Sequence, residues 1–231
     1  MLAEYSLERL EEKLGYHFKN RELLRQAVTH SSYANEQRIN RRLDYERLEF
    51  LGDAVLEMIT SAFLFESYPE LKEGELTRKR ATIVCGSALA FCARDMELGG
   101  FILLGKGEEA TGGREKENIT SDVVEAIIGA IFEDGGYESA RDFIYRVVLS
   151  DLEHKQLFFD SKTLLQEYSQ KEYGKTLDYV VLEETGPDHD KEFVVEVRLN
   201  GKAMGRGSGK TKKAAEQKAA YEALLASKAG K

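Results

Sequence analysis

Apolar residues recur at intervals of three and four through the first two thirds of the chain, which is the spacing of one face of an α-helix. Leu7, Leu10 and Leu14 mark a first amphipathic helix, and residues 23–27 mark a second. A longer helix follows from residue 48 and must end at Pro69, because proline removes a backbone donor and clashes with the preceding turn. The same spacing predicts a helix over residues 76–96, a helix that carries Asp122 and closes at the Gly135-Gly136 pair, and a last helix over 139–152. Residues 99–107 are rich in glycine, and we expect a loop there.

The pattern changes beyond residue 161. A helix is predicted over 162–173, followed by alternating apolar and polar residues over 177–184, 193–199 and 202–207. Turn residues separate these strands, and Asn200-Gly201 is a strong hairpin signal. An alanine-rich helix over 212–226 completes the order α-β-β-β-α. We therefore expect a multi-domain chain: an all-α domain over 1–155, a linker over 156–161 and an α+β domain over 162–231.

Composition narrows the class of protein. The chain has 231 residues, of which 42% are hydrophobic and 32% charged, as in a globular protein with a core. No apolar run is long enough to cross a membrane, and the N-terminus lacks the basic and apolar segments of an export signal. Cys85 and Cys92 lie within the expected helix 76–96, and we expect both to be reduced core residues. These features favour a cytoplasmic protein without a membrane partner.

Net charge is −8, which by itself argues against a polyanionic partner. The average conceals an asymmetry, because residues 198–213 contain several lysines and arginines and no acidic residue. Local charge decides whether a phosphate backbone can dock. A nucleic-acid surface in the second domain is therefore compatible with an acidic chain.

Two helices carry acidic residues within apolar surroundings. Glu46, Glu49 and Asp53 share one helix face, and Asp122 and Glu125 share another, because residues three or four apart lie on the same side. Buried carboxylates need protons, partners or metal ions. Spacing alone leaves two interpretations open: a solvated helix face, or a site where a divalent cation joins both helices.

The segment 46–56 (ERLEFLGDAVL) resembles the signature of the ribonuclease III family. The resemblance continues through 27–33 (AVTHSSY), 73–77 (EGELT) and 121–126 (SDVVEA), and the second domain resembles a double-stranded-RNA-binding domain. It implies a Mg²⁺-dependent endoribonuclease, with Mn²⁺ as a substitute, that cuts double-stranded RNA into staggered products with 5′-phosphates. Ribosomal, messenger and transfer RNA precursors are the substrates that the family implies.

The resemblance also implies residue roles. Metal-binding positions are Glu49, Asp53, Asp122 and Glu125, and Asp53 and Glu125 are also the catalytic pair. Glu46 and Glu73 match supporting acids. Phe50 matches an aromatic residue that contacts the partner subunit in a homodimer, although an ordinary core phenylalanine is the alternative reading.

Double-stranded RNA presents a shallow minor groove flanked by phosphates. By resemblance, RNA contacts are expected from the first helix of the second domain, the 186–189 loop and the start of the last helix; the residues are Lys162, Gln166, His189, Lys210, Lys212 and Lys213. The alternative for the lysines is a solvated helix end. His30 is expected to be a structural hydrogen-bonding residue.

Two other functions remain open. In a non-enzymatic regulator, the second domain would bind double-stranded RNA and the first would only dimerise. A metal phosphohydrolase for small substrates would leave the basic second domain unexplained. The complete set of acidic residues favours the endonuclease.

Overall fold

The computed structural model describes residues 4–38, 43–152, 161–173, 177–186, 191–209 and 211–229. The chain divides into two compact units, Met1–Leu152 and Glu153–Lys231. Each unit has a hydrophobic core of its own, as expected for separate domains. The expected boundary at 155 and most of the 156–161 linker lie outside the described residues, so this part of the domain prediction stays a prediction.

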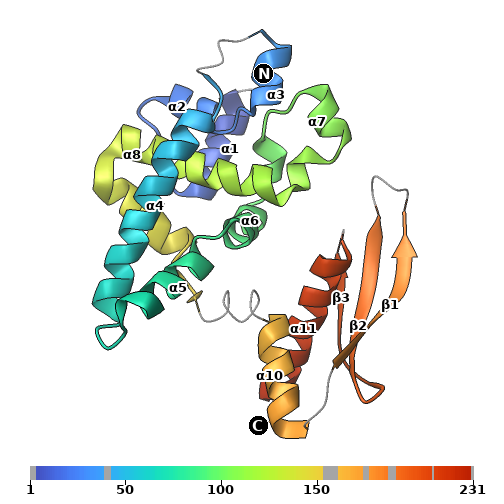
Figure 1. Cartoon of the computed structure of the whole chain (residues 1–231). Coiled ribbons are helices and arrows are strands. Elements are labelled where there is room, and N and C mark those ends of the chain that lie inside the picture. Colours follow the sequence, from blue (N-terminus) through green and yellow to red (C-terminus); the bar gives the residue numbers. More distant parts are fainter. Residues whose placement is uncertain are drawn as a thin grey trace. The chain divides into compact units, whose positions relative to one another are not determined.

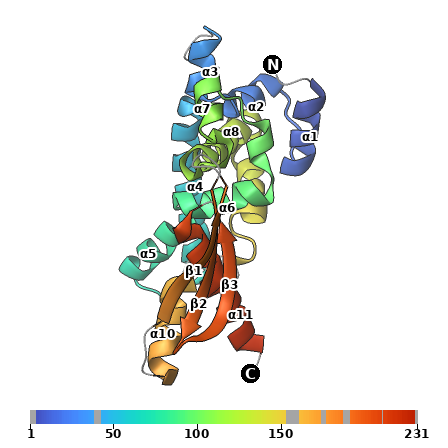
Figure 2. The same cartoon turned by 90° about the vertical axis from the view of Figure 1, so that its right-hand side faces the viewer.

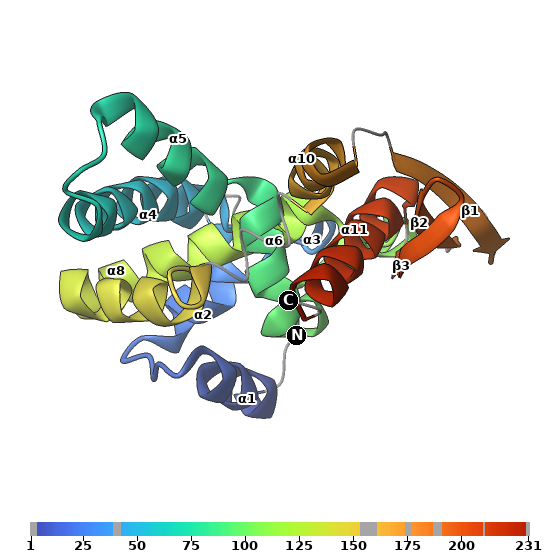
Figure 3. The same ribbon diagram turned by 90° about the horizontal axis from the view of Figure 1, so that it is seen from below.

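The first unit is helical (Figure 1). Its elements in chain order are α1 (Glu4–Leu14), α2 (Arg21–Ala27), α3 (Ser31–Glu36), α4 (Glu46–Ser67), α5 (Glu73–Ile83), α6 (Gly86–Asp95), η2 (Leu98–Phe101), α7 (Lys106–Ala110), η3 (Gly113–Glu115) and α8 (Glu117–Val147). Helices α4 and α8 run side by side (Figure 3), and both contribute fully buried aliphatic side chains to the core. The expectation of an all-α first domain is confirmed.

Three details of the predicted helices are wrong. The single helix over 76–96 is two helices, because Val84 leaves the helical conformation and Cys85 is extended at ψ 153°. Cys85 is accordingly half-exposed at the turn, whereas Cys92 is buried in α6, and both are free thiols. The expected glycine-rich loop over 99–107 includes parts of η2 and α7, and the periodicity did not predict the short helix α3.

Gly136 interrupts α8, as the glycine pair predicts. Its φ of 76° and ψ of −170° lie outside the helical region and in a conformation that side chains disfavour. The helix then continues to Val147, packing Phe143 and Ile144 into the same core. Both parts of the kinked segment therefore contribute buried side chains to one core.

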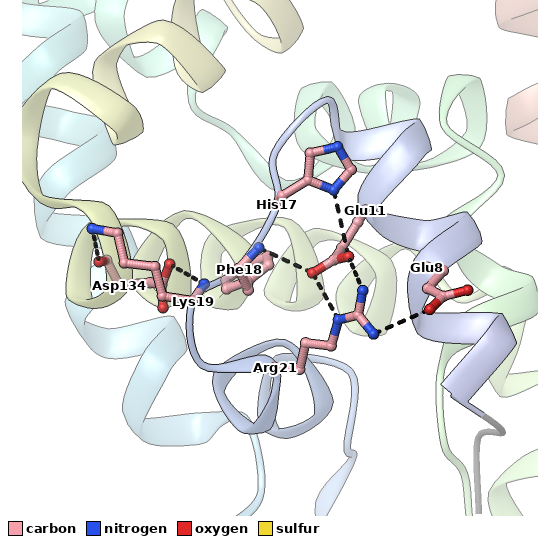
Figure 4. Close-up of polar contacts among 7 residues, drawn as sticks. All are labelled: Glu8, Glu11, His17, Phe18, Lys19, Arg21 and Asp134. Atoms are coloured by element: carbon pink, nitrogen blue, oxygen red, sulfur yellow. Dashed lines mark hydrogen bonds and ion pairs between the residues drawn. The ribbon is translucent and has the colours of Figure 1, made fainter.

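The N-terminal helix is attached through two buried or half-buried carboxylates (Figure 4). Glu11 is 1% exposed and accepts hydrogen bonds from the Phe18 amide and from the Arg21 guanidinium. Asp134, on α8, accepts from the Tyr16 hydroxyl at 2.7 Å and from the amide of Lys19. Since buried charges require such partners, these two carboxylates fix the segment between α1 and α2.

The second unit packs α10 (Ser161–Tyr173) and α11 (Lys212–Ala229) against one face of an antiparallel sheet (Figures 1 and 2). The sheet order is β1 (Leu177–Thr185), β2 (Glu192–Leu199) and β3 (Lys202–Gly209). Asn200 and Gly201 both have positive φ, as a tight hairpin requires. The predicted order α-β-β-β-α is confirmed.

Glycine permits the close approach of β3 to α11. A Cβ atom on Gly207 would lie 2.3 Å from the backbone nitrogen of Ala219. The core between the layers is correspondingly built from small side chains of α11, including Ala215, Ala219 and Ala223, against Val195 and Val197 of β2. Among the described residues, no helix is both long enough and apolar enough to traverse a bilayer.

Candidate active site

Three carboxylates from two helices meet in the first unit. Glu49 extends from α4, and Asp122 and Glu125 extend from α8. Each offers one oxygen within 4.8 Å of the others, and all three residues are partly buried. Oxygen ligands at this separation are the donor set that a divalent cation such as Mg²⁺ prefers. The expected juxtaposition of the two acidic helices is present.

Two glycines bring these helices together. A Cβ atom on Gly52 would lie 1.8 Å from the Glu125 carbonyl oxygen, and one on Gly129 would lie 2.1 Å from the Leu48 carbonyl oxygen. The backbones of α4 and α8 therefore touch where any other residue would separate them. This crossing lies within about one turn of Glu49 and Glu125, so it sets the spacing of their carboxylates.

The electrostatics of the cluster favour a bound cation. Burial, followed by the charges of Asp53, Asp122 and Glu49, raises the pKa of Glu125 to about 8. Burial and nearby carboxylates, first among them Asp122, raise the pKa of Glu49 to about 7. Burial also raises the pKa of Asp122. Without a cation, Glu49 and Glu125 are therefore readily protonated near neutral pH, because ionisation would bury charge and place like charges together.

The other predicted acids lie outside this group of three. Asp53 is exposed and is not within the compact trio, but its charge contributes to the raised pKa of both Glu49 and Glu125. Glu46 is exposed at the start of α4, and its charge contributes to the raised pKa of Glu49. Glu73 starts α5 and is not among the charges that raise those two pKa values; its carboxylate accepts from the Thr77 hydroxyl at 3.4 Å.

Tyr45 is a site residue that sequence reasoning missed. It immediately precedes α4, is 4% exposed, and places its hydroxyl 3.4 Å from Asp122 Oδ2. Burial and the neighbouring carboxylates, led by Asp122, raise the pKa of this hydroxyl. Its ring meets the His30 ring edge-on with centroids 5.6 Å apart. A buried tyrosine needs a polar partner for its hydroxyl, but sequence alone does not identify that partner.

His30 has the structural role that was predicted. Its Nδ1 accepts the Ser32 amide and so caps α3, which places the ring proton of the neutral form on Nε2. The His30 amide donates to Leu103 O, within a short parallel pairing of 29 with 103. These contacts hold the His30 ring in place against Tyr45.

The residues expected to contact RNA differ in how they are held. Lys162, on α10, lies 2.5 Å from the Glu216 carboxylate of α11 and 4.8 Å from the centre of the Tyr179 ring. Lys212 approaches Glu184 at 3.7 Å, whereas Lys213 is exposed at the start of α11. Gln166 is half-exposed on α10. His189 and Lys210 lie outside the described residues.

Phe50 projects into solvent in the isolated chain. Its exposed fraction is 80%, and Met58 and Phe65 of the same helix are 49% and 75% exposed. At about 100° per residue, the three lie within roughly 80° of one another around α4. The alternative of an ordinary core phenylalanine is therefore wrong for the single chain, and the apolar stripe of Phe50, Met58 and Phe65 suits a protein contact.

Family models match both units. The model described as Ribonuclease-III-like matches residues 20–152, and the double-stranded RNA binding motif matches residues 161–226. Ribonuclease 3 of a Bacillus cereus strain is 49% identical over 216 residues, covering 93% of this chain and 88% of that protein. Ribonuclease 3 of Bacillus cytotoxicus has the same identity and coverage.

Solved structures match the first unit. One is the nuclease domain of ribonuclease III from Campylobacter jejuni, with 40% identity and a TM-score of 0.59, covering 64% of this chain and 99% of that one. A second structure of that domain gives 42% identity and a TM-score of 0.56, covering 61% of this chain and 92% of the other. The first of these structures is described as showing flexibility in a region involved in dimer formation.

Proposed function

Because this chain belongs to the ribonuclease III family and is a double-strand-specific endoribonuclease, we propose that Glu49, Asp53, Asp122 and Glu125 form its Mg²⁺ site. The observation that carries the proposal is the meeting of Glu49, Asp122 and Glu125 oxygens within 4.8 Å. Mn²⁺ is expected to substitute, because it accepts the same oxygen ligands.

The residues present fit such a cation. Glu49, Asp122 and Glu125 supply hard oxygen donors, and burial, followed by the charges of neighbouring carboxylates, raises the pKa values of Glu49 and Glu125. Within the described part of the chain, no lysine or arginine is among the side chains that bond Asp122 or shift the pKa of Glu49 and Glu125. A divalent cation would therefore complete the charge balance of this cluster.

In the proposed reaction, water adds to the phosphorus and the bond from phosphorus to the 3′-oxygen breaks. The products are a 3′-hydroxyl and a 5′-phosphate. When bound, the cation would supply positive charge opposite the charge that develops on the phosphate. Asp53, which is exposed beside the trio, and Glu125 are proposed as the catalytic pair. Glu46 and Glu73 are proposed as supporting acids at the edge of the site.

A Glu125→Gln substitution tests this proposal. It keeps side-chain size but removes a cation ligand. We therefore expect the rate of cleavage of a long RNA duplex in Mg²⁺ to fall by at least about 100-fold, the effect of losing one group that stabilises the charge of a transition state. Duplex binding, measured without Mg²⁺, should be unchanged. Glu133→Gln is a matched control, because Glu133 is exposed on the same helix. Equal cleavage by wild type and Glu125→Gln would reject the assigned site, and absence of cleavage by both would favour a binding protein.

We also propose that the second unit binds the duplex through Gln166 on α10 and through Lys212 and Lys213 at the start of α11. The N-terminus of α11 carries the positive end of the helix dipole, which favours a phosphate, although Thr211 Oγ1 already accepts the Ala214 amide. Lys162 is proposed as a weaker contact, because Glu216 already pairs with its ammonium. His189 and Lys210 remain predictions from the sequence.

A homodimer is proposed to form the complete enzyme. The stripe of Phe50, Met58 and Phe65 is apolar and exposed, and the ribonuclease III nuclease domain from Campylobacter jejuni has a region involved in dimer formation. Two copies would supply two sites, and staggered cuts on the two strands would follow from their symmetry. Processing of ribosomal, messenger and transfer RNA precursors, and a cytoplasmic location, stay predictions.

A further inference from the structure

We propose that Tyr45 is a positioning residue of the metal centre, holding the Asp122 carboxylate in place through its hydroxyl. The inference rests on the proposed function, because it concerns how one of the proposed ligands is oriented. Its basis is the hydrogen bond from Tyr45 Oη to Asp122 Oδ2, 3.4 Å long in the cation-free protein. Groups behind a ligand commonly fix its direction and so its affinity for the metal.

The backbone of Tyr45 is itself firmly held. Its amide donates to the Thr29 carbonyl at 2.9 Å, and its carbonyl accepts the amides of Leu48 and Glu49 in the first turn of α4. The residue is 4% exposed, and its ring lies against His30. Tyr45 therefore connects the turn that carries Glu49 to the Asp122 carboxylate on α8.

Other donors to Asp122 are weaker candidates for this role. The Ser121 hydroxyl lies 3.3 Å from Asp122 Oδ1 but only 2.9 Å from the Asn118 carbonyl oxygen. Because a hydroxyl has a single proton, the Ser121 hydroxyl donates to the Asn118 carbonyl oxygen, which is the nearer acceptor. Within the described part of the chain, Tyr45 is thus the side chain whose proton is free to orient Asp122.

Tyr45→Phe removes the hydroxyl and keeps the ring. In calorimetric titration of Mn²⁺ into full-length protein without RNA, we expect the dissociation constant to rise roughly 10-fold, the lower end of the effect of losing a group behind a ligand. Tyr16→Phe is the matched control, because the Tyr16 hydroxyl also donates to an aspartate, Asp134, at 2.7 Å. That variant should lose thermal stability but retain the Mn²⁺ affinity of wild type.

Activity supplies a second readout. The Mg²⁺ concentration that gives half-maximal cleavage should rise by a similar factor in Tyr45→Phe, while kcat at saturating Mg²⁺ and KM for the duplex stay close to wild type. A structural defect would instead lower kcat at every Mg²⁺ concentration. In an Asp122→Asn background, Tyr45→Phe should cause no further loss of Mn²⁺ affinity, since residues acting through one contact are not additive.

The outcomes separate this inference from the metal site. If wild type does not bind Mn²⁺, or if Glu125→Gln binds it as well as wild type does, both the site and the positioning role are wrong. If wild type binds Mn²⁺ and Tyr45→Phe binds equally well, only the positioning role is lost. A Tyr45→Phe protein that does not fold, as judged by circular dichroism, would make the hydroxyl a folding requirement and would also overturn the role.

Discussion

Replacing Gly52 by alanine is the sharpest test of how the fold positions the active site. The added Cβ would start 1.8 Å from the Glu125 carbonyl oxygen and 2.9 Å from the Gly129 nitrogen. Protein Cβ atoms essentially never lie closer than 3.0 Å to another heavy atom, so the two helices must move apart by more than an ångström. Both obstructing atoms belong to helical backbone, which cannot rotate away as a side chain would.

The free energy of unfolding follows from two opposing terms. Alanine in place of glycine favours a helix by about 1 kcal/mol. Overpacking a core costs about 1–3 kcal/mol and more when backbone must shift. We place the cost at the upper end and expect a net loss of about 2 kcal/mol, equivalent to a fall in Tm of about 4–8 °C for a unit of this size. Separation of Glu49 from Glu125 should also weaken Mn²⁺ binding.

Urea unfolding and Mn²⁺ calorimetry measure the two consequences. Gly107→Ala is the control, because no atom of the described chain lies within 4 Å of its added Cβ and the residue is exposed in α7. That variant should be at least as stable as wild type and bind Mn²⁺ normally. The reasoning is refuted if Gly52→Ala is as stable as wild type, or if it is destabilised but retains full Mn²⁺ affinity.

Three further predictions concern pH, assembly and RNA. The pKa of Glu125 is raised from 4.5 to about 8, so between these pH values the folded metal-free protein binds more protons than the unfolded chain. Its Tm in EDTA should therefore fall as pH rises from 4.5 to 8. If the Tm of Glu125→Gln falls with pH as steeply as that of wild type, the prediction is wrong. Phe50→Ala should raise the dimer dissociation constant at least about 100-fold, because two buried aromatic contacts are lost; unchanged sedimentation would reject the proposed interface. Lys213→Ala should weaken duplex binding and reduce the slope of log affinity against log salt by about 1, whereas an unchanged slope would remove Lys213 from the RNA surface.

The sequence predicted the elements of both units where periodicity was strong. The helix beginning at Glu46 and the hairpin at Asn200-Gly201 follow from local rules, because spacing and turn chemistry act over a few residues. The break at Cys85 was missed for the same reason. Gly86 directly follows the break, but a single glycine inside a helical pattern is tolerated and does not by itself predict the end of a helix.

The site was predicted as residues but not as an arrangement. The acidic spacing indicated Glu46, Glu49, Asp53, Asp122 and Glu125, of which Glu49, Asp122 and Glu125 form the compact group, yet it left open whether the two helices touch. Gly52 and Gly129 carried that information, since a small residue on each of two apolar helices permits backbone contact. Tyr45 carried no comparable signal. Its partner Asp122 lies far away in sequence, and only the fold brings its hydroxyl to that carboxylate.

The same close crossing explains why the fold tolerates its acidic cluster. Burial first, and then the like charges of neighbouring carboxylates, raise the pKa values of Glu49 and Glu125, so ionisation of this cluster opposes folding of the cation-free protein. Backbone contact at Gly52 and Gly129, surrounded by fully buried aliphatic side chains such as Leu56 and Ile127, supplies compensating packing at the same place. The carboxylates cannot relieve their repulsion by separating, so protonation or a cation must relieve it. A sequence that violates the rule against buried like charges, yet strengthens the packing beside the violation, is what physical reasoning expects of a functional site.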